Sequence, residues 1–200
     1  DVVGYNYMEH LYDEHHEKHP DWNIFGSETC ASVQSRGIYH FPASNRLLTY
    51  IDNQCSSLGN CTSNWGAKDS MDTIVKDRDH KFCFGQYVWS GWDYIGEPTP
   101  YFSKNSFFGQ VDTAGFEKDT YYVYQAEWTD YKKAPMVHLL PYWDWNEGQL
   151  IDIRAYSNAP KTEVFFNDKS LGVFHHDHEK GLECSGKWQF PYSKGTLKAV

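Results

Sequence analysis

Two folds in succession are predicted, a mixed α/β region followed by an all-β region. In the first region, short and almost continuously apolar strands alternate with segments of helical periodicity, which is typical of parallel strands covered by helices. In the second, short strands follow one another closely with turn residues between them, which indicates a β-sandwich. The period changes near residues 133–135, so we predict domains at residues 1–133 and 134–200.

The α/β region contains three predicted strands, at residues 2–7, 23–27 and 84–89, with Glu28 directly after the second. Helical spacing predicts helices from Met8 to before Pro20, at residues 71–78 with Asp69 as N-cap, and at 121–128. Turn residues at 60–66 mark a long loop. This succession suits a (β/α) barrel, which needs eight strands to close. We therefore expect the missing strands on the amino-terminal side, in a longer protein.

The all-β region is predicted from alternation of apolar and polar residues. Ile151, Ile153 and Ala155 alternate with polar neighbours and indicate a half-buried strand. Further strands are predicted at residues 162–166, 171–174, 187–190 and 196–200, with a turn at 167–170. Because the last strand reaches the last residue, we expect the sandwich to continue beyond it.

Composition excludes some classes of partner and leaves two interpretations open. A net charge of -9 and a pI near 5.5 argue against nucleic acid, and no apolar run reaches the length of a membrane span. The five scattered cysteines favour free thiols over a Cys55–Cys61 bridge. Aromatic residues make up 18% of the chain, which suits either a sugar-binding cleft or the aromatic core of a β-rich protein.

Three aromatic or acidic residues stand where predicted strands end. In a (β/α) barrel the working residues lie at the carboxyl ends of strands, and these ends carry Tyr7, Glu28 and Trp89. A carboxylate can attack an anomeric carbon, a phenol can hydrogen-bond to it, and an indole can pack against a sugar ring. Each residue alone could be structural, but their convergence favours glycoside cleavage.

Several blocks of sequence resemble glycoside hydrolase family 2, in particular its β-galactosidase branch. The blocks are residues 4–7 (Gly-Tyr-Asn-Tyr), 25–29 (Phe-Gly-Ser-Glu-Thr), 35–37 with 39–42, and 88–98 (Val-Trp-Ser-Gly-Trp-Asp-Tyr-Ile-Gly-Glu-Pro). Residues 164–171 also resemble the strand–turn–strand of the sandwich that follows the barrel in many of these enzymes. The resemblance covers nearly the whole chain, and the blocks occur in the family's order.

The resemblance implies strands six to eight of a TIM barrel followed by an immunoglobulin-like sandwich. It implies retaining hydrolysis of terminal β-galactosides without a cofactor, with Glu28 as nucleophile, Tyr7 supporting it, and Trp89 and Asn6 binding the sugar. The family's acid/base is the Glu of an Asn-Glu pair on strand four. The chain has only Asn146-Glu147, beyond the barrel region, so we expect the isolated chain to be inactive.

The sequence departs from the branch in one respect and leaves alternatives open. Glu28 is followed by Thr29-Cys30-Ala31 rather than by an early His, so the metal ligands of some β-galactosidases are not carried over, and we predict no metal site. β-Glucuronidases and β-mannosidases share the barrel. A non-catalytic carbohydrate-binding module is the alternative of a different class, with Trp143, Trp145 and Trp188 as stacking candidates, although core packing is favoured for them.

Other clusters are interpreted as structural. His15 and His19 are read as a solvated helix end, residues 175–179 (His-His-Asp-His-Glu) as a charged surface loop, and Asp93 and Glu97 as structural carboxylates. An open strand edge predicts pairing either with the rest of a larger enzyme or with a second copy in a homo-oligomer. The bacterial cytoplasm, periplasm and extracellular space all remain open as locations.

Overall fold

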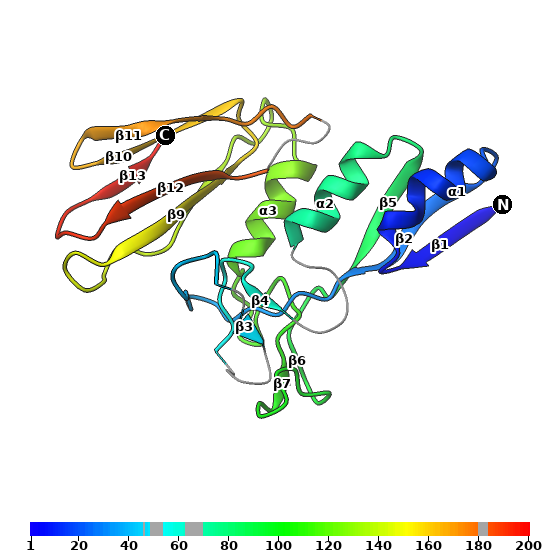
Figure 1. Ribbon diagram of the computed structural model, residues 1–200, viewed down its shortest axis with the longest axis horizontal. Coiled ribbons are helices and arrows are strands. Elements are labelled where there is room, and N and C mark those ends of the chain that lie inside the picture. Colours follow the sequence, from blue (N-terminus) through cyan, green and yellow to red (C-terminus); the bar gives the residue numbers. More distant parts are fainter. Residues whose placement is uncertain (46, 49–53, 63–69, 180–183) are drawn as a thin grey trace.

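The computed structural model describes residues 1–45, 47–48, 54–62, 70–179 and 184–200. The molecule is elongated, with a parallel sheet at the N-terminal end, helices in the middle and antiparallel sheets at the other end (Figure 1). Within the described residues, no helix combines the length and apolar character that crossing a membrane requires.

The N-terminal part is a parallel three-stranded sheet in the order β1-β2-β5. Its strands are β1 (Val2–Asn6), β2 (Asn23–Cys30) and β5 (Cys83–Trp89), and its helices are η1 (Glu9–Leu11), α1 (Tyr12–Lys18), α2 (Ser70–Asp79) and α3 (Asp119–Trp128). These bounds confirm the predicted strands and helices. β2 runs on past Glu28 to Cys30, so the prediction that this strand ends before Glu28 was wrong.

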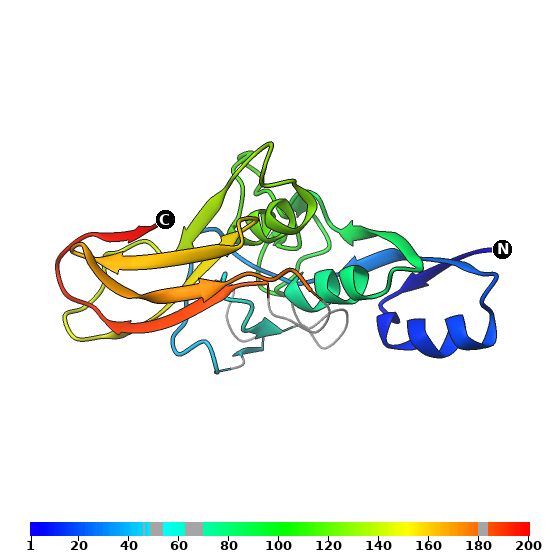
Figure 2. The ribbon, with the colours of Figure 1, turned by 90° about the horizontal axis from the view of Figure 1, so that it is seen from above.

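One face of the parallel sheet is covered and the other is open in this chain. Ile24 is fully buried and clusters with Tyr5 and with Tyr12 of α1; α1 and α2 lie on the same side of the strands (Figure 2). On the alternate positions, Phe25 contacts Phe84 and Tyr87, with ring centroids 5.0 and 5.9 Å away. Phe84 and Tyr87 remain 61% and 69% exposed, so this apolar face has no cover within the described residues.

Very short strands organise the segments that leave the sheet. β3 (Leu47–Leu48) pairs in parallel with β4 (Cys61–Thr62), and β6 (Tyr94–Ile95) pairs with β7 (Asn105–Ser106) in an antiparallel hairpin after β5. The proposed N-cap Asp69 and residues 63–66 of the predicted turn lie outside the described residues. The five cysteines all lie in the described part of the chain and form no disulfide bond, in agreement with the predicted thiols.

The C-terminal part consists of two three-stranded antiparallel sheets in the orders β11-β10-β13 and β12-β9-β8. The strands are β8 (Val137–Leu140), β9 (Leu150–Ser157), β10 (Lys161–Phe166), β11 (Lys169–His175), β12 (Gly186–Pro191) and β13 (Leu197–Ala199). The five predicted strands are all present. β8 was not predicted, because its four residues follow a polar turn and show no clear alternation.

Aromatic rings fill the space between these two sheets. Phe166 of β10 contacts Phe190 of β12 at 5.0 Å, and Trp143 packs against both rings. Trp188 of β12 contacts Phe174 of β11 at 6.3 Å. These contacts support core packing, rather than sugar stacking, for Trp143 and Trp188.

An apolar core joins the two parts across the predicted boundary at residues 133/134. Ile74 of α2 and Tyr124 of α3 belong to one buried cluster with Leu140 of β8 and Tyr156 of β9. The α/β part is therefore packed directly onto the sandwich rather than linked to it by a bare connector.

The prediction that residues 175–179 form a charged surface loop holds for His175, Asp177 and Glu179, which are exposed, but not for the two histidines between them. His176 is 2% exposed, and its Nε2 lies 3.0 Å from the Thr162 hydroxyl. His178 Nδ1 lies 2.8 Å from Oε1 of Glu127 on α3. The segment after β11 thus folds back onto the helical part, where a helix carboxylate contacts one nitrogen of the His178 imidazole.

Candidate active site

Tyr7 and Glu28 are held together where β1 and β2 meet. The parallel register pairs Asn6 with Glu28, and the Tyr7 backbone N–H donates to the Glu28 carbonyl at 3.0 Å. The Tyr7 hydroxyl then donates to Glu28 Oε1 at 2.7 Å. Adjacent parallel strands bring their carboxyl ends to one edge of a sheet, so residues distant in sequence form a direct carboxylate–phenol contact.

The Tyr7 phenol is kept in its donating form. Burial raises the pKa of Tyr7, and the hydrogen bond to Glu28 raises this pKa further. At neutral pH the hydroxyl therefore retains its proton and donates a hydrogen bond to the carboxylate. The bond fixes the orientation of the half-buried Glu28 side chain.

Trp89 lies at the same edge, one strand further along. Cys30 of β2 is paired with Trp89 of β5, and the Ala31 N–H donates to the Trp89 carbonyl at 3.2 Å. The Trp89 ring makes an edge contact with Tyr94, with centroids 6.0 Å apart. Tyr7 and Trp89 both pack against one buried cluster, made of Ala31, Val33, Cys55, Cys61 and Phe108.

Asn6 is exposed at the end of β1. Its Oδ1 accepts a hydrogen bond from the Ser27 hydroxyl at 2.6 Å, one residue before Glu28. The structure thus brings all four predicted site residues to the carboxyl-end edge of the parallel sheet.

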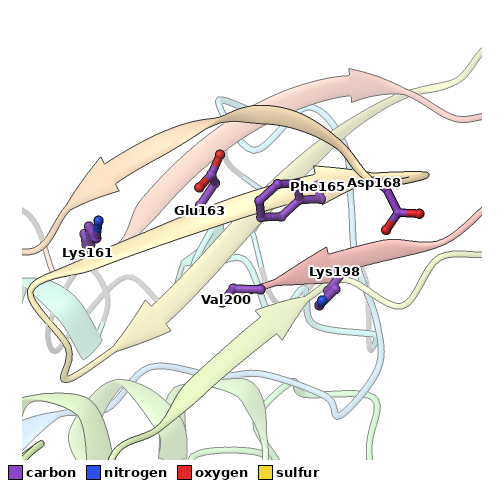
Figure 3. A pocket seen from close by; sticks show the side chains of 6 residues that line it. All are labelled: Lys161, Glu163, Phe165, Asp168, Lys198 and Val200. Atoms are coloured by element: carbon purple, nitrogen blue, oxygen red, sulfur yellow. The ribbon is translucent and has the colours of Figure 1, made fainter.

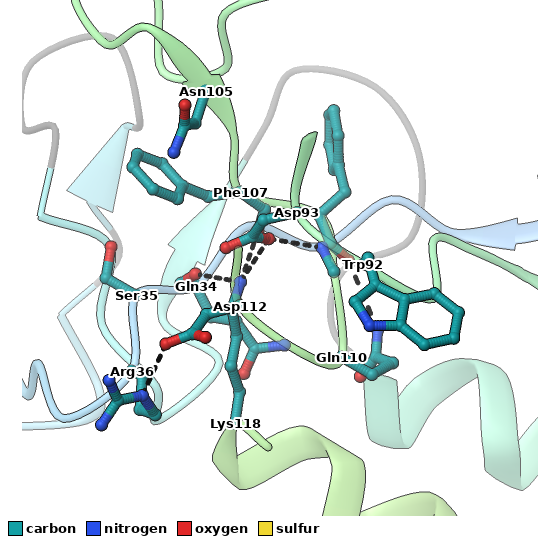
Figure 4. A network of polar contacts seen from close by, with 12 residues as sticks. Gln34, Ser35, Arg36, Trp92, Asp93, Asn105, Phe107, Gln110, Asp112 and Lys118 are labelled. Atoms are coloured by element: carbon teal, nitrogen blue, oxygen red, sulfur yellow. Dashed lines mark hydrogen bonds and ion pairs between the residues drawn. The ribbon is translucent and has the colours of Figure 1, made fainter. Parts of the chain in front are cut away.

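A buried polar network lies beside this edge (Figure 4), and sequence reasoning missed its centre, Lys118. Asp93 is 7% exposed and accepts from Lys118 Nζ at 2.6 Å, which supports the structural interpretation of this carboxylate. Glu97 is exposed and accepts from the Tyr94 hydroxyl at 2.8 Å. No signal in the sequence marks Lys118, since lysines are rarely buried.

The histidines of α1 take part in packing. His15 Nδ1 lies 2.6 Å from the Tyr5 hydroxyl, and His19 stacks on Trp22 with centroids 3.9 Å apart. Across the described part of the chain, no three His, Cys, Asp or Glu side chains gather in a way that could hold a metal ion.

Residues 148–200 match a family model described as "Domain of unknown function (DUF4982)". The whole chain is 39% identical to 24% of the β-galactosidase BoGH2A of Bacteroides ovatus. It also matches, over its whole length, 28% of the structure of a β-glycosidase from Bacteroides vulgatus, with a TM-score of 0.81 and 26% identity.

A glycosyl hydrolase family 2 member from Bacteroides cellulosilyticus shares the fold, with a TM-score of 0.67 and 23% identity over the whole chain and 26% of that structure. The chain thus spans about a quarter of the length of the proteins it matches. These similarities point to the same family as the ordered blocks of sequence and the parallel sheet with its tyrosine and glutamate. The chain belongs to glycoside hydrolase family 2.

Proposed function

We propose that this chain supplies the nucleophile of a retaining β-galactosidase, and that the nucleophile is Glu28. The observation that carries the proposal is the 2.7 Å hydrogen bond from Tyr7 to Glu28 Oε1 at the carboxyl end of the sheet. In such a reaction the carboxylate attacks the anomeric carbon and forms a glycosyl-enzyme as the leaving oxygen departs. Water then attacks the same carbon, frees the carboxylate and gives a sugar of retained configuration.

The neighbouring side chains have complementary roles in this proposal. Tyr7 orients the carboxylate and stabilises its negative charge before attack. Trp89 offers an indole face against which the apolar side of a galactose ring can pack. Asn6 is exposed and held by Ser27, and it contributes an amide to the sugar hydroxyls.

The acid/base carboxylate is proposed to come from the remainder of the enzyme. Glu147, in the chain's single Asn-Glu pair, is exposed and lies in the turn before β9. A retaining mechanism places its two carboxyl groups roughly 5 Å apart, so another segment must approach Glu28.

The open side of the sheet offers a place for that remainder. A groove of about 780 Å³ runs between β5 and α3, and Tyr87, Trp92 and Trp128 line it. These rings are 69%, 66% and 55% exposed. We propose that further strands and helices of a (β/α) barrel cover this groove, with β1, β2 and β5 as barrel strands six to eight.

The proposed sugar is galactose. The residues of the sequence blocks, which resemble the β-galactosidase branch, and the similarity to the β-galactosidase of Bacteroides ovatus support this choice. The test is hydrolysis of p-nitrophenyl β-galactoside, β-glucuronide and β-mannoside by the complete protein, with the anomer of the first product followed by NMR. Fastest cleavage of the galactoside with retention supports the proposal. Fastest cleavage of another glycoside would replace the sugar, and inversion would overturn the mechanism. The isolated chain should cleave none of them.

A non-catalytic sugar-binding role of the sandwich is the alternative. A hollow of about 380 Å³ lies on the outer face of β10 and β13 (Figure 3). Its lining residues are Lys161, Glu163, Phe165, Asp168, Lys198 and Val200, which include one aromatic ring. Calorimetric titration with galactose, lactose and longer β-glycans tests this role; a Phe165→Ala variant that binds as well as the parent would exclude the hollow.

A further inference from the structure

We propose that Lys118 is a positioning residue, whose buried ammonium ties together the segments that follow Glu28 and Trp89 and so sets the sugar-binding geometry. The inference rests on the proposed function of that pair of residues. It concerns a side chain that contacts neither of them directly in the structure.

Lys118 lies at the start of α3 with a side chain that is 0% exposed. Its Nζ donates to Asp93 Oδ1 at 2.6 Å, to the Gln34 carbonyl at 2.8 Å and to the Phe107 carbonyl at 3.4 Å. An ammonium group has three N–H donors, and three acceptors surround this one (Figure 4). The group is therefore fully satisfied by three separate segments of the chain.

Two of those segments continue directly from the proposed site. Gln34 belongs to the buried stretch that follows β2 and Glu28, and Asp93 belongs to the loop that follows β5 and Trp89. Among the described residues, the Ala31-to-Trp89 bond is the last backbone hydrogen bond that joins these two segments directly. The ammonium provides a connection further from the sheet.

The third segment lies beneath Trp89. The Ser90 N–H donates to the Phe108 carbonyl at 3.2 Å, and the Gly109 N–H donates to Asp93 Oδ1 at 2.8 Å. Phe108 is 2% exposed and belongs to the cluster on which Tyr7 and Trp89 pack. A Cβ at Gly109 would lie 2.1 Å from the Asp93 nitrogen, so the two backbones are in close contact. The Lys118–Asp93 pair thus holds the layer that supports Trp89.

Stability alone does not account for this arrangement. Burial lowers the pKa of Lys118 and raises the pKa of Asp93, while the charge of each partner opposes the shift of the other. Desolvating two charges offsets much of their attraction, so a buried pair is often replaceable by apolar residues without loss of stability. Backbone hydrogen bonds already join neighbouring segments, from the Gln34 N–H to the Phe107 carbonyl at 3.0 Å and from the Asp93 N–H to the Val111 carbonyl at 2.9 Å. The ammonium adds one group that contacts Gln34, Asp93 and Phe107 together, which a neutral pair does not reproduce.

That difference supplies the test, made in the complete protein. The variants are Lys118→Met, the double variant Lys118→Met/Asp93→Asn, in which the amide oxygen can still accept from the Gly109 N–H, Trp89→Ala alone and combined with the double variant, and exposed Lys132→Met as control. The measurements are the Tm, the Kd for isopropyl β-D-thiogalactoside, and kcat and KM for the p-nitrophenyl galactoside. Because Lys118→Met strands the Asp93 charge and can fail to fold, the double variant decides the outcome.

We expect the double variant to keep the wild-type Tm within a few degrees while its Kd and KM rise about tenfold, because small displacements of binding groups have large effects. In the Trp89→Ala background the double variant should raise the Kd and KM little further, since we propose that Lys118 acts through the position of Trp89. A wild-type Kd in the double variant, or fully additive effects, would overturn the inference. Glu28→Gln in the same series tests the proposed nucleophile separately. If this variant retains full activity, the assignment of the nucleophile is wrong, while the Kd values of the Lys118, Asp93 and Trp89 variants still test the role of Lys118.

Discussion

The two ends of the molecule differ in how far their apolar side chains are exposed. In the sandwich, Ile151, Ile153 and Ala155 of β9 are fully buried, and the rings between the sheets pack on one another. In the parallel sheet, Phe84 and Tyr87 are 61% and 69% exposed although their strand is apolar almost throughout. Strands that are apolar on both faces are typical of sheets covered on both sides. The inner face of β9 is therefore covered within this chain, whereas we propose that further barrel strands cover the sheet that carries Glu28.

The largest expected effect follows from placing the chemistry in the sheet and not in the sandwich. Glu28→Gln removes the proposed nucleophile, so kcat/KM of the complete enzyme for its glycoside should fall by at least about 10³-fold. Steady-state kinetics with p-nitrophenyl β-galactoside measure this loss.

Glu147→Gln is the matched control, because Glu147 is an exposed glutamate at the other end of the molecule and follows an asparagine as the family's acid/base does. It should leave kcat/KM unchanged. A large loss in the Glu147 variant together with a small loss in the Glu28 variant would reverse the assignment of the two regions.

The difference in self-sufficiency predicts different responses to truncation of apolar side chains. Ile153→Ala should lower the free energy of unfolding by about 2–5 kcal/mol, in the isolated chain and in the complete protein alike, because the site is already closed. Phe84→Ser should cost little in the isolated chain and substantially more in the complete protein, where we propose that the ring is covered. Denaturant unfolding of both forms measures this, and an equal cost of Phe84→Ser in the two forms would contradict the comparison.

The stability of the segment after β11 should respond to pH through two histidines, His176 within the sandwich and His178 in contact with Glu127 of α3. Burial lowers the pKa of His176 to about 4, so its neutral form stabilises the fold above pH 6.5 and this contribution is lost as the pH falls toward 4. The loss is about 3 kcal/mol. The hydrogen bond to Glu127 raises the pKa of His178, so its contribution is present below pH 6.5 and is lost as the pH rises through the raised value.

Unfolding free energies measured from pH 4 to 9 check both contributions. His176→Gln should flatten the acid side of the profile, and His178→Gln should flatten the side above pH 6.5. An unchanged profile in either variant would show that the imidazole concerned does not contribute to the stability of the fold.

The smallest expected effect concerns the Tyr7 hydroxyl, which donates a hydrogen bond to Glu28. Tyr7→Phe removes one hydrogen bond to a charged group, which is worth about 1.5–3 kcal/mol, so kcat should fall roughly 10- to 100-fold. Pre-steady-state kinetics should locate the loss in the formation of the glycosyl-enzyme. Tyr5→Phe is the control, since its hydroxyl contacts His15 rather than the site. Equal losses in the two variants would indicate a general effect on the sheet.

Regular elements were predictable where periodicity was sustained. β1, β2, β5 and β9–β13 follow apolar runs or alternation, and α1, α2 and α3 follow helical spacing. The two-residue strands β3, β4, β6 and β7 and the four-residue β8 were not predicted, because so few residues carry no period. The burial of His176 was missed because it depends on contacts with Thr162 and Pro160, which only the folded sheet brings beside it.

The candidate site also contains residues that could be predicted from the sequence and one that could not. Tyr7, Glu28 and Trp89 stand at or near the carboxyl ends of strands, and the topology of a parallel sheet alone brings them to one edge. Lys118 could not be predicted, because its acceptors come from Gln34, Asp93 and Phe107, which only the folded chain brings together.

The most direct test of the central claim is to trap the covalent intermediate in the complete enzyme. Incubation with a 2-deoxy-2-fluoro-β-galactoside bearing a good leaving group should inactivate the enzyme and add one fluorosugar. Peptide mass spectrometry should then place that sugar on Glu28. A fluorosugar on any other carboxylate would contradict the assignment of Glu28, and turnover of β-galactosides without any labelled carboxylate would contradict the covalent mechanism.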